Sequence, residues 1–460
     1  MTQLKLPWRL RKWLDRRALQ LAGFSSPLGV IRLRNCASQA SLVAVGDIAL
    51  SESIVQEFLK NGTSGVFGDV FPLMSDADFR VGNLETVLTQ QTLPIHAEIA
   101  GTGTMKASPE AVTVLKEAGF DILTVANNHC RDYRMAGLTE CLANLDRAGI
   151  GHCGGGPTPS EARKPAIAIV RGVRVGVLGY CDNFRVDRES AENVTPVPPN
   201  DDVVLADIAA LREEADLIIL QLHWGFEFVL YPLKTYRDRA RRFAASGADL
   251  VLCHHAHVPM GLEVWGNSVI AHGMGNFLFP NNAYVREGHP WTRRSFILRA
   301  EFDRNGITAV SAIPCQNTEG SAVRLSRGQA RRETLGALHR ISVDLKNDTK
   351  LRRVERERIL REALSIFSRV RDAEDLRVVE QCAMLLRSPC HRDLLARLES
   401  EFGAPGAMFE EFLAEVRAAY GRPEIASQAI KTAQSEQFGR IVERLQAVQP
   451  LGHSPLGTLP

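Results

Sequence analysis

The sequence predicts an α/β sandwich that is followed by a separate α-helical region. Three observations lead to this fold class. From Ser41 to about residue 325, short β-rich segments alternate with segments of helical character. Most of the β-rich segments are apolar at consecutive positions, which is typical of strands buried on both faces. Beyond residue 325, arginines become frequent and apolar residues recur at helical spacing, so no further strand is expected there.

The predicted strands follow one another through the α/β part of the chain. They cover residues 41–47, 79–85, 120–128, 164–170, 173–180, 215–224, 248–255, 267–277 and 294–302. Two of the intervening helices have clear ends. One begins at Ser108, a candidate N-cap before Pro109, and ends at Gly119; the other covers residues 135–148 and ends at Gly149.

Composition divides the chain into four segments. We expect a basic amphipathic segment at residues 1–38, the α/β domain at 39–325, a helical region at 326–448 and a disordered tail at 449–460. Residues 1–38 contain eight Lys and Arg against one acidic residue, Asp15. Their apolar positions repeat at helical spacing, which leaves two alternatives. Residues 1–22 form either a helix on an anionic membrane surface or a helix that packs its apolar face on the core.

Charge and cysteine content exclude several classes of function. The 55 Lys and Arg nearly balance the 53 Asp and Glu, so the net charge of +2 gives no general attraction to nucleic acid, which is not expected as a partner. The nine cysteines are odd in number and form no Cys-x-x-Cys pair, and no secretory signal is recognised. Reduced thiols and a cytoplasmic location are therefore expected. No segment reaches the roughly 18 apolar residues of a membrane-spanning helix.

Three histidines fall within four positions in the segment VLCHHAHV, residues 251–258. In an extended chain, His255 and His257 would point to one side of the strand together with Cys253, and His254 would point to the other. Such a pair of imidazoles is found both in metal sites and in hydrogen-bonded surface pairs. The rest of the sequence has to decide between these alternatives.

Polar side chains also stand at the ends of other predicted strands. They are Asp47, Glu85, Asn127 to His129 with Asp132 nearby, and His223. Ligands of open α/β sheets bind at the carboxyl ends of the strands, so these side chains are expected to converge. Oxygen and nitrogen donors together suit Mn, Fe or Zn. Each feature alone also fits a turn, a cap or a packed aromatic pair, but their joint order favours a metal site.

Five segments carry a resemblance to a known family. They are GDIALS, VGNLETVLT, LTVANNHCRDYRMAGLTECLANLDRAGIGHCGGG, LIILQLHWGFEF and GADLVLCHHAHVPMGLEVWGNSVIAHGMGNFLF. Together they resemble the CapA family of poly-γ-glutamate capsule synthesis proteins, which is similar in fold to calcineurin-like metallophosphoesterases. The resemblance covers residues 41–280 and implies a metallophosphoesterase-like sandwich with two divalent metal ions, Mn, Fe or Zn. It does not extend to residues 1–38 or to the helical region.

The resemblance implies a role for each matching residue. Asp47 and His257 would hold the first metal ion, Glu85 would bridge both ions, and the second ion would be held by Asn128, His223 and His255. His129 would protonate the leaving group, oriented by Asp132. Contact with the substrate or support of the ligands is expected from Trp224, Glu227, His254 and Asn276.

Two positions depart from the phosphoesterase pattern. Its bridging carboxylate is generally an aspartate, where this chain has Glu85. Its Asp-x-His signature appears here as Asp47-Ile48-Ala49, so the first metal site lacks one histidine ligand. The CapA pattern generally lacks this histidine as well.

These features imply two functions of different class. The first is a metal-dependent hydrolase that acts on a phosphate ester or an anionic polymer linkage in capsule or poly-γ-glutamate synthesis. The alternative is a non-catalytic accessory protein that binds a capsule polyanion or its synthase, with the helical region as the docking module. The expected partners are thus an anionic small molecule or polymer and a capsule synthase. A third interpretation, in which every histidine is structural, requires the order of the strand-end residues to be a coincidence.

Overall fold

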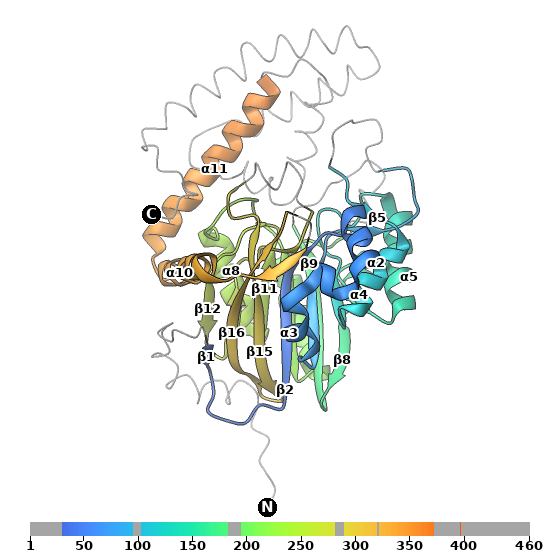
Figure 1. Cartoon of the computed structure of the whole chain (residues 1–460). Helices are drawn as coiled ribbons and strands as arrows, with labels where there is room; N and C mark the ends of the chain where they lie inside the picture. The colour runs from blue at the N-terminus through green and yellow to red at the C-terminus, as the bar shows by residue number, and fades with distance from the viewer. Residues whose placement is uncertain are drawn as a thin grey trace, which may run out of the picture.

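The computed structural model describes residues 30–94, 103–182, 195–280, 289–319, 322–371 and 396. In this part of the chain two β-sheets pack face to face, and helices cover their outer faces (Figure 1). The α/β sandwich followed by helices is confirmed. The expected helix within residues 1–22, the helices expected beyond residue 371 and the tail at 449–460 lie outside the described residues.

The first sheet has nine strands in the order β1-β16-β15-β2-β3-β6-β7, with β14 paired to β2 and β17 paired to β16. Strands β2, β3, β6, β7 and β14 run parallel to their neighbours in this group, whereas β15, β16, β17 and β1 are joined by antiparallel pairing. The bounds are β1 (Val30–Arg32), β2 (Ala40–Ile48), β3 (Phe79–Leu84), β6 (Ile122–Thr124), β7 (Gly151–Cys153), β14 (Asn276–Leu278), β15 (Arg294–Asp303), β16 (Gly306–Asn317) and β17 (Val323–Leu325).

The second sheet has six strands in the order β12-β13-β11-β10-β9-β8. Its inner strands are parallel, and the two outer strands, β12 and β8, pair antiparallel to their neighbours. The bounds are β8 (Ala166–Val170), β9 (Val173–Cys181), β10 (Leu217–His223), β11 (Leu250–His254), β12 (Leu262–Trp265) and β13 (Ser268–Ala271). A separate pair is formed by β4 (Val87–Leu88) and β5 (Lys106–Ala107).

Alternation of side chains explains why both sheets are buried on both faces. In β2, Leu42 and Ala44 face the core between the sheets, while Val43 and Val45 face the outer helices. In β10, residues 217 and 219 face the core between the sheets, and residues 218, 220 and 222 face outward. A strand with a period of two and apolar residues at every position requires cover on each side, which gives the four-layered arrangement.

The helices form the outer layers. The first sheet is covered by α2 (Glu52–Phe67), α4 (Val112–Glu117) and α5 (Arg134–Ala148), and the second by α7 (Asp201–Glu214) and α8 (Lys234–Ser246). Shorter turns are η2 (Gly68–Val70), α3 (Phe71–Ser75), η3 (Pro109–Ala111) and α6 (Pro159–Ala162). Gly149 ends α5 with a φ of 74°, the left-handed conformation that glycine adopts without strain. Among the described residues, no helix is both long and apolar enough to cross a bilayer.

Two helices follow the last strand. The first, α10 (Gly328–Asp344), lies against β12, where the Ser342 hydroxyl accepts a hydrogen bond of 2.9 Å from the Leu262 backbone nitrogen. The second, α11 (Asp348–Arg371), contacts α8 and extends away from the sheets (Figure 1). In the expected N-terminal segment, β1 pairs with β16. The boundaries at residues 39 and 326 stay a prediction.

Some elements differ from the sequence-based expectation. The strand expected at 120–128 is only β6, because the chain turns after Thr124. The segment 267–277 is split between β13 in one sheet and β14 in the other, with Gly275 at a φ of 73° between them. Strand β16 was not predicted, although it is twelve residues long. Pro314 within it argues against a strand in a sequence, because proline donates no ladder hydrogen bond.

Candidate metal centre

The six residues expected as metal ligands come from both sheets. Asp47 lies near the carboxyl end of β2, and Glu85 and Asn128 follow β3 and β6. His223 is the last residue of β10, while His255 and His257 follow β11. The carboxyl ends of these parallel strands meet at one edge of the sandwich, as expected for a ligand site in an α/β fold.

Two overlapping groups of donor atoms lie at this edge. Among the described residues, one ligand atom each from Asp47, Glu85 and His223 lie within 4.8 Å of one another, and so do atoms from Glu85, His255 and His257. Glu85 belongs to both groups, which is the position that a bridging carboxylate needs. The amide oxygen of Asn128 lies 2.9 Å from Nε2 of His223 and adds an oxygen donor.

Glu85 is the least satisfied of these side chains. It is fully buried, and neither of its carboxylate oxygens has a hydrogen-bond partner among the described residues. Nε2 of His223 and Nε2 of His257 each lie 3.8 Å from its Oε1, beyond hydrogen-bond distance. Burial, followed by the nearby charge of Asp47, raises the pKa of Glu85 well above its ordinary value. A buried carboxylate in this state fits a site built for a cation.

Asp47 is held in its charged form. Its Oδ1 accepts a hydrogen bond of 2.9 Å from Nδ2 of Asn83 and lies 3.1 Å from Nδ1 of His254, and its Oδ2 lies 3.4 Å from Nδ1 of His257. Burial alone would raise the pKa of Asp47, but the hydrogen bonds and charges of the two histidines hold it well below its usual range. The carboxylate is thus available as an anionic ligand.

The three imidazoles differ in charge. Burial, then the neighbouring histidines, lowers the pKa of His223 well below its ordinary value, and burial lowers the pKa of His255 to about 4. Both rings are therefore neutral near pH 7, the form that binds metals. Burial opposes the charged form of His257, yet Glu85 and Asp47 raise its pKa to about 10. The ring of His257 lies between the two acidic side chains, with Nδ1 at 3.4 Å from Asp47 and Nε2 at 3.8 Å from Glu85, and a metal ion would have to replace its proton to bind there.

The backbone of the histidine segment is not extended. Strand β11 ends at His254, and His255 and His257 have φ values of 83° and 56°. The expectation that His255 and His257 would share one face of a strand is therefore wrong; a turn with two left-handed residues brings them together. Non-glycine residues in this conformation cost about 1–3 kcal/mol each and concentrate at functional sites.

A close backbone contact supports the first carboxylate. A Cβ atom on Gly46 would lie 1.9 Å from the carbonyl oxygen of Gly275, so only glycine fits at this position. That carbonyl accepts a hydrogen bond of 3.0 Å from the backbone nitrogen of Asp47. Gly46 thus lets the chain before β14 approach the Asp47 end of β2.

His129 and Asp132 form the contact expected of a proton donor and its orienting group. Nδ1 of His129 lies 2.7 Å from Oδ2 of Asp132, which also accepts a hydrogen bond of 2.6 Å from the backbone nitrogen of Met105. Both side chains are buried. The backbone nitrogen of His129 donates to Oδ1 of Asn127, which forms the turn that this asparagine pair predicts.

The remaining predicted residues occupy three kinds of position. Asn276 is fully buried, and its Oδ1 lies 2.8 Å from Nδ1 of His257, so it contacts a predicted ligand. His254 joins Asp47 to Gln221, whose Oε1 lies 3.2 Å from Nε2 of His254. Trp224 is packed against Tyr236 with 5% of its surface exposed. Glu227 is half-buried, and its charge acts on His255 and His257.

Sequence reasoning missed the role of Asn83. This fully buried side chain donates to Asp47, its Nδ2 lies 3.3 Å from Nδ1 of His223, and its Oδ1 accepts from Nδ2 of Asn127. It therefore links residues from three strand ends. The signal was present in the sequence as an asparagine inside the apolar strand FRVGNL, two positions before Glu85.

The position of the missing histidine is apolar. Ala49 is buried against Phe279, and the Phe279 ring meets the ring of His257 edge to face at 5.1 Å between centroids. Cys130 belongs to neither donor group among the described residues, and burial raises the pKa of its thiol to about 12. The donor set is thus carboxylate, amide and imidazole, which fits Mn, Fe or Zn.

The chain is similar to proteins of capsule synthesis. The sequence model of a family described as "Bacterial capsule synthesis protein PGA_cap" matches residues 41–281. The "Capsule biosynthesis protein CapA" of Bacillus anthracis is 28% identical over 286 residues, which are 61% of this chain and 68% of the relative. The "PGA biosynthesis protein CapA" of Bacillus subtilis (strain 168) is 28% identical over 293 residues, 63% of this chain and 75% of the relative.

A likeness to a solved structure is weaker. A hypothetical protein from Thermus thermophilus aligns over 60% of this chain and 99% of its own length, with 14% sequence identity and a TM-score of 0.39. A similarity of this size supports no inference about function.

Proposed function

Because the chain belongs to the bacterial capsule synthesis protein family matched at residues 41–281, we propose that it is a metal-dependent hydrolase of capsule or poly-γ-glutamate synthesis. Its substrate in this proposal is a phosphate ester or a related anionic polymer linkage. The relatives bear names of capsule and PGA biosynthesis, and hydrolysis is our own addition to what those names say.

The state of Glu85 carries the proposal. This side chain is buried, has no hydrogen bond among the described residues and belongs to both donor groups. Burying a carboxylate without a partner costs folding free energy, and a purely structural role would not explain that cost. A cation between the groups would remove that cost. The family resemblance divides the ligands differently from these two groups. It implies Asp47, Glu85 and His257 at one ion and Glu85, Asn128, His223 and His255 at the other, whereas the observed groups join His223 to Asp47 and His257 to His255. Two divalent ions, when bound, lower the pKa of water and neutralise charge that develops on the substrate.

The protein's own proton donor is His129. With Nδ1 directed at Asp132, the ring keeps Nε2 for a proton that it can give to the oxygen or nitrogen of the leaving group. The Met105 backbone nitrogen also donates to Asp132 and keeps that carboxylate in place.

The test combines metal content with hydrolysis. Purified protein loaded with Mn, Fe or Zn is assayed against p-nitrophenyl phosphate, bis-p-nitrophenyl phosphate and poly-γ-glutamate. We expect His255→Ala to lose bound metal and activity together, and His129→Ala to keep its metal while kcat falls by about 10²–10⁴. A wild-type protein that binds none of the metals, or one in which both variants behave as wild type, would contradict the proposal.

The apolar contact of Ala49 with Phe279, at the position where phosphoesterases have a histidine ligand, favours a second candidate function. With one ligand fewer at the first site, the protein could bind a capsule polyanion or its synthase without hydrolysing anything. Metal stoichiometry separates the candidates, because hydrolysis by the proposed chemistry requires two ions per chain. In cells, the accessory function predicts that polymer output survives His129→Ala but is lost on deletion of residues 326–460.

A further inference from the structure

Residues 224–233 connect β10 to α8 and are called the 224–233 loop below. One part of this loop lies at the candidate metal centre. The Phe228 backbone nitrogen donates a hydrogen bond of 2.9 Å to the carbonyl of Ala256, the residue between His255 and His257. The ring of Phe228 lies 6.0 Å from that of His257 between centroids. The loop therefore contacts the turn that carries two of the predicted ligands.

Glu227 stands next to Phe228 and brings a negative charge to the same place. The hydrogen bond of the Phe228 backbone nitrogen to Ala256 also fixes the neighbouring residue, Glu227, against the turn that carries His255 and His257. A shift of the loop would thus move a carboxylate relative to these two predicted ligands. Phe228 also has a φ of 59°, so the loop is held in a conformation that an isolated chain would avoid.

The other side of the loop is held by α10 and α11. The Tyr231 hydroxyl donates a hydrogen bond of 2.9 Å to Oδ2 of Asp344 in α10. Nζ of Lys350 in α11 donates to the same oxygen at 2.5 Å and to the Tyr231 hydroxyl at 3.2 Å, and it lies 4.8 Å from the centre of the Tyr231 ring. One side chain of the loop thus joins both helices.

Apolar packing continues this contact. The loop contributes Phe226, Val229, Leu230 and Leu233 to the same core cluster as residues 341, 351, 354, 359 and 360 of the two helices. The guanidinium of Arg358 in α11 also lies 5.5 Å from the centre of the Phe226 ring. Burial of several large side chains is the larger stabilising contribution, and the polar contacts fix the geometry.

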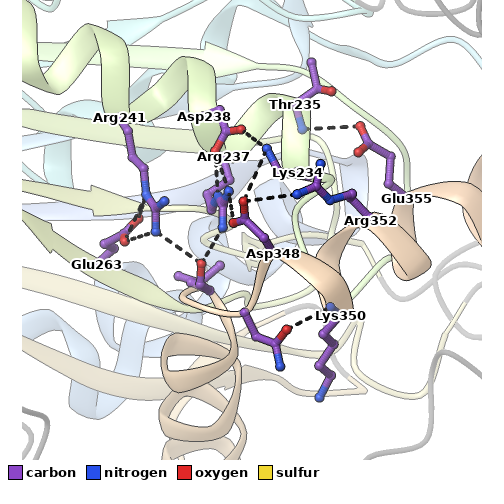
Figure 2. A network of polar contacts seen from close by, with 12 residues as sticks. Lys234, Thr235, Arg237, Asp238, Arg241, Glu263, Asp348, Lys350, Arg352 and Glu355 are labelled. Carbon is purple, nitrogen blue, oxygen red and sulfur yellow. Dashed lines mark hydrogen bonds and ion pairs between the residues drawn. The ribbon is translucent and has the colours of Figure 1, made fainter.

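The same helices also hold the start of α8, directly after the loop (Figure 2). Helix α8 has no side-chain N-cap of its own, and Oε1 of Glu355 in α11 accepts a hydrogen bond of 3.3 Å from the backbone nitrogen of Thr235. Arg237 is buried and donates to the carbonyl of Leu345 at 2.6 Å and to Asp348 at 2.7 Å. The polar network in Figure 2 therefore joins α8 to α11 and, through Arg241 and Glu263, to β12.

We propose that α10 and α11 position the metal centre through the 224–233 loop, with Tyr231, Asp344 and Lys350 as the positioning residues. The helices hold the loop so that Phe228 keeps its hydrogen bond to Ala256 and Glu227 stays beside the histidine turn. The effect on metal binding rests on the proposed function. The claim that α10 and α11 hold the 224–233 loop in place is independent of that function.

Hydrogen exchange of the metal-free protein tests the hold on the loop. The reporter is the Phe228 amide, whose bond to Ala256 opens when the loop moves. We expect Lys350→Met and Tyr231→Phe to speed its exchange by about 10-fold. Arg353→Met is the matched control, because Arg353 lies in α11 and pairs only with Glu357 of its own helix in the contacts seen here. If the Phe228 amide exchanges at the wild-type rate in both Lys350→Met and Tyr231→Phe, the proposal is overturned.

Metal affinity tests the positioning role, measured by calorimetric titration with Mn²⁺ and Zn²⁺. We expect Lys350→Met to weaken binding by about 10-fold and Arg353→Met to leave it unchanged. Combining Lys350→Met with Glu227→Gln should weaken binding less than the two separate effects predict, because both act through one loop. Faster exchange with unchanged affinity overturns the positioning role. A wild-type protein that binds neither ion overturns the proposed function instead, and the exchange result still decides whether the helices hold the loop.

Discussion

Two buried glutamates show how differently this fold treats the same side chain. Glu263 lies in an ion pair with Arg241, at 3.0 and 3.1 Å from its Nε, and 3.4 Å from Nε2 of His272. Burial would raise the pKa of Glu263, but these two partners lower it. Glu85 is buried more deeply, has no hydrogen-bond partner among the described residues, and has a raised pKa. The structure of the sandwich explains Glu263 but not Glu85.

The contrast between Glu85 and Glu263 predicts that replacing each by glutamine changes the free energy of unfolding in opposite directions. Glu85→Gln should stabilise the metal-free protein by about 1–3 kcal/mol, since it removes a buried carboxyl group that lacks partners. The same variant should lose metal binding. Glu263→Gln, the matched control, should destabilise by about 1–3 kcal/mol, because Arg241 and His272 lose their anionic partner. Urea unfolding in EDTA measures both, and destabilisation of Glu85→Gln would indicate a structural role.

His272 gives a prediction for pH. Burial lowers the pKa of His272, so the folded protein resists protonation that the unfolded chain accepts below its ordinary pKa of about 6.5. Stability from this group is complete above that pH and falls as the pH drops toward the folded pKa, by at most about 1.4 kcal/mol per pH unit. Between pH 7.5 and 5.5, His272→Gln should therefore lose about 1 kcal/mol less than wild type in EDTA. Equal losses would mean that His272 titrates normally in the fold.

At the residue scale, the sequence predicts which residues belong to the candidate site better than it predicts the contacts between them. Asp47, Glu85 and His223 could be found because each stands at the end of an apolar strand. Asn83 was overlooked, because its links to Asp47 and His223 join strands that are far apart in the chain. The left-handed turn at His255 and His257 was likewise hidden, because tertiary contacts enforce a backbone that these residue types rarely adopt.

At the scale of elements, the contact between α8 and α11 is built around one buried charge, Arg237, whose partners Asp238 and Asp348 reach the surface (Figure 2). Arg237 is the largest fully buried side chain in the part of the chain that the structure describes, and it is held by a carbonyl and two carboxylates. An arginine in this position can be kept only if its donors are paired. The helical region is therefore joined to the α/β part by specific polar contacts as well as by apolar packing.

Arg237→Met tests the contribution of this contact to stability. The methionine keeps much of the apolar stem but leaves Asp348 and Asp238 without their buried partner. We expect a loss of about 1–3 kcal/mol in the free energy of unfolding, measured by urea titration. Arg353→Met on the exposed face of α11 should change it by less than about 0.5 kcal/mol. Equal effects of the two variants would mean that the buried network contributes nothing beyond surface charge.

Elements with strong periodic patterns were predictable, and those shaped by neighbours were not. The predicted strands at 41–47 and 79–85 agree closely with β2 and β3, and the helix ending at Gly149 is α5. The strand expected at 120–128 ends at Thr124, because Asn127 turns the chain through its own side-chain contacts. Strand β16 depends on pairing with β15 and β17, which overrides the local effect of Pro314.

At the scale of the whole molecule, α10 and α11 share one apolar core cluster with the second sheet and α8. The cluster on the outer face of the second sheet includes Ile218 of β10, Phe243 of α8, Ile341 of α10 and Leu360 of α11. The fold class followed from the alternation of strands and helices, whereas this packing of α10 and α11 on the sandwich did not follow from their charge-rich sequences.

A shortened chain that ends at residue 327 tests how far the sandwich depends on the helices. Removing α10 and α11 exposes part of the core beside the 224–233 loop, so we expect the melting temperature to fall by more than about 10 °C or the protein to aggregate. Thermal unfolding followed by circular dichroism, with the full chain as control, measures the change. An unchanged melting temperature would show that the helices only rest on a complete domain.

The donors of the proposed metal centre are divided along the chain, with Asp47, Glu85 and Asn128 in the first part and all three imidazoles after residue 222. During translation, the ribosome therefore delivers every oxygen donor before the first nitrogen donor. A nascent chain of about 200 residues would offer only carboxylates and an amide, the ligands of abundant hard ions such as Mg²⁺. In that proposal, the set of donors that favours a transition metal over Mg²⁺ is complete only when His257 has left the exit tunnel.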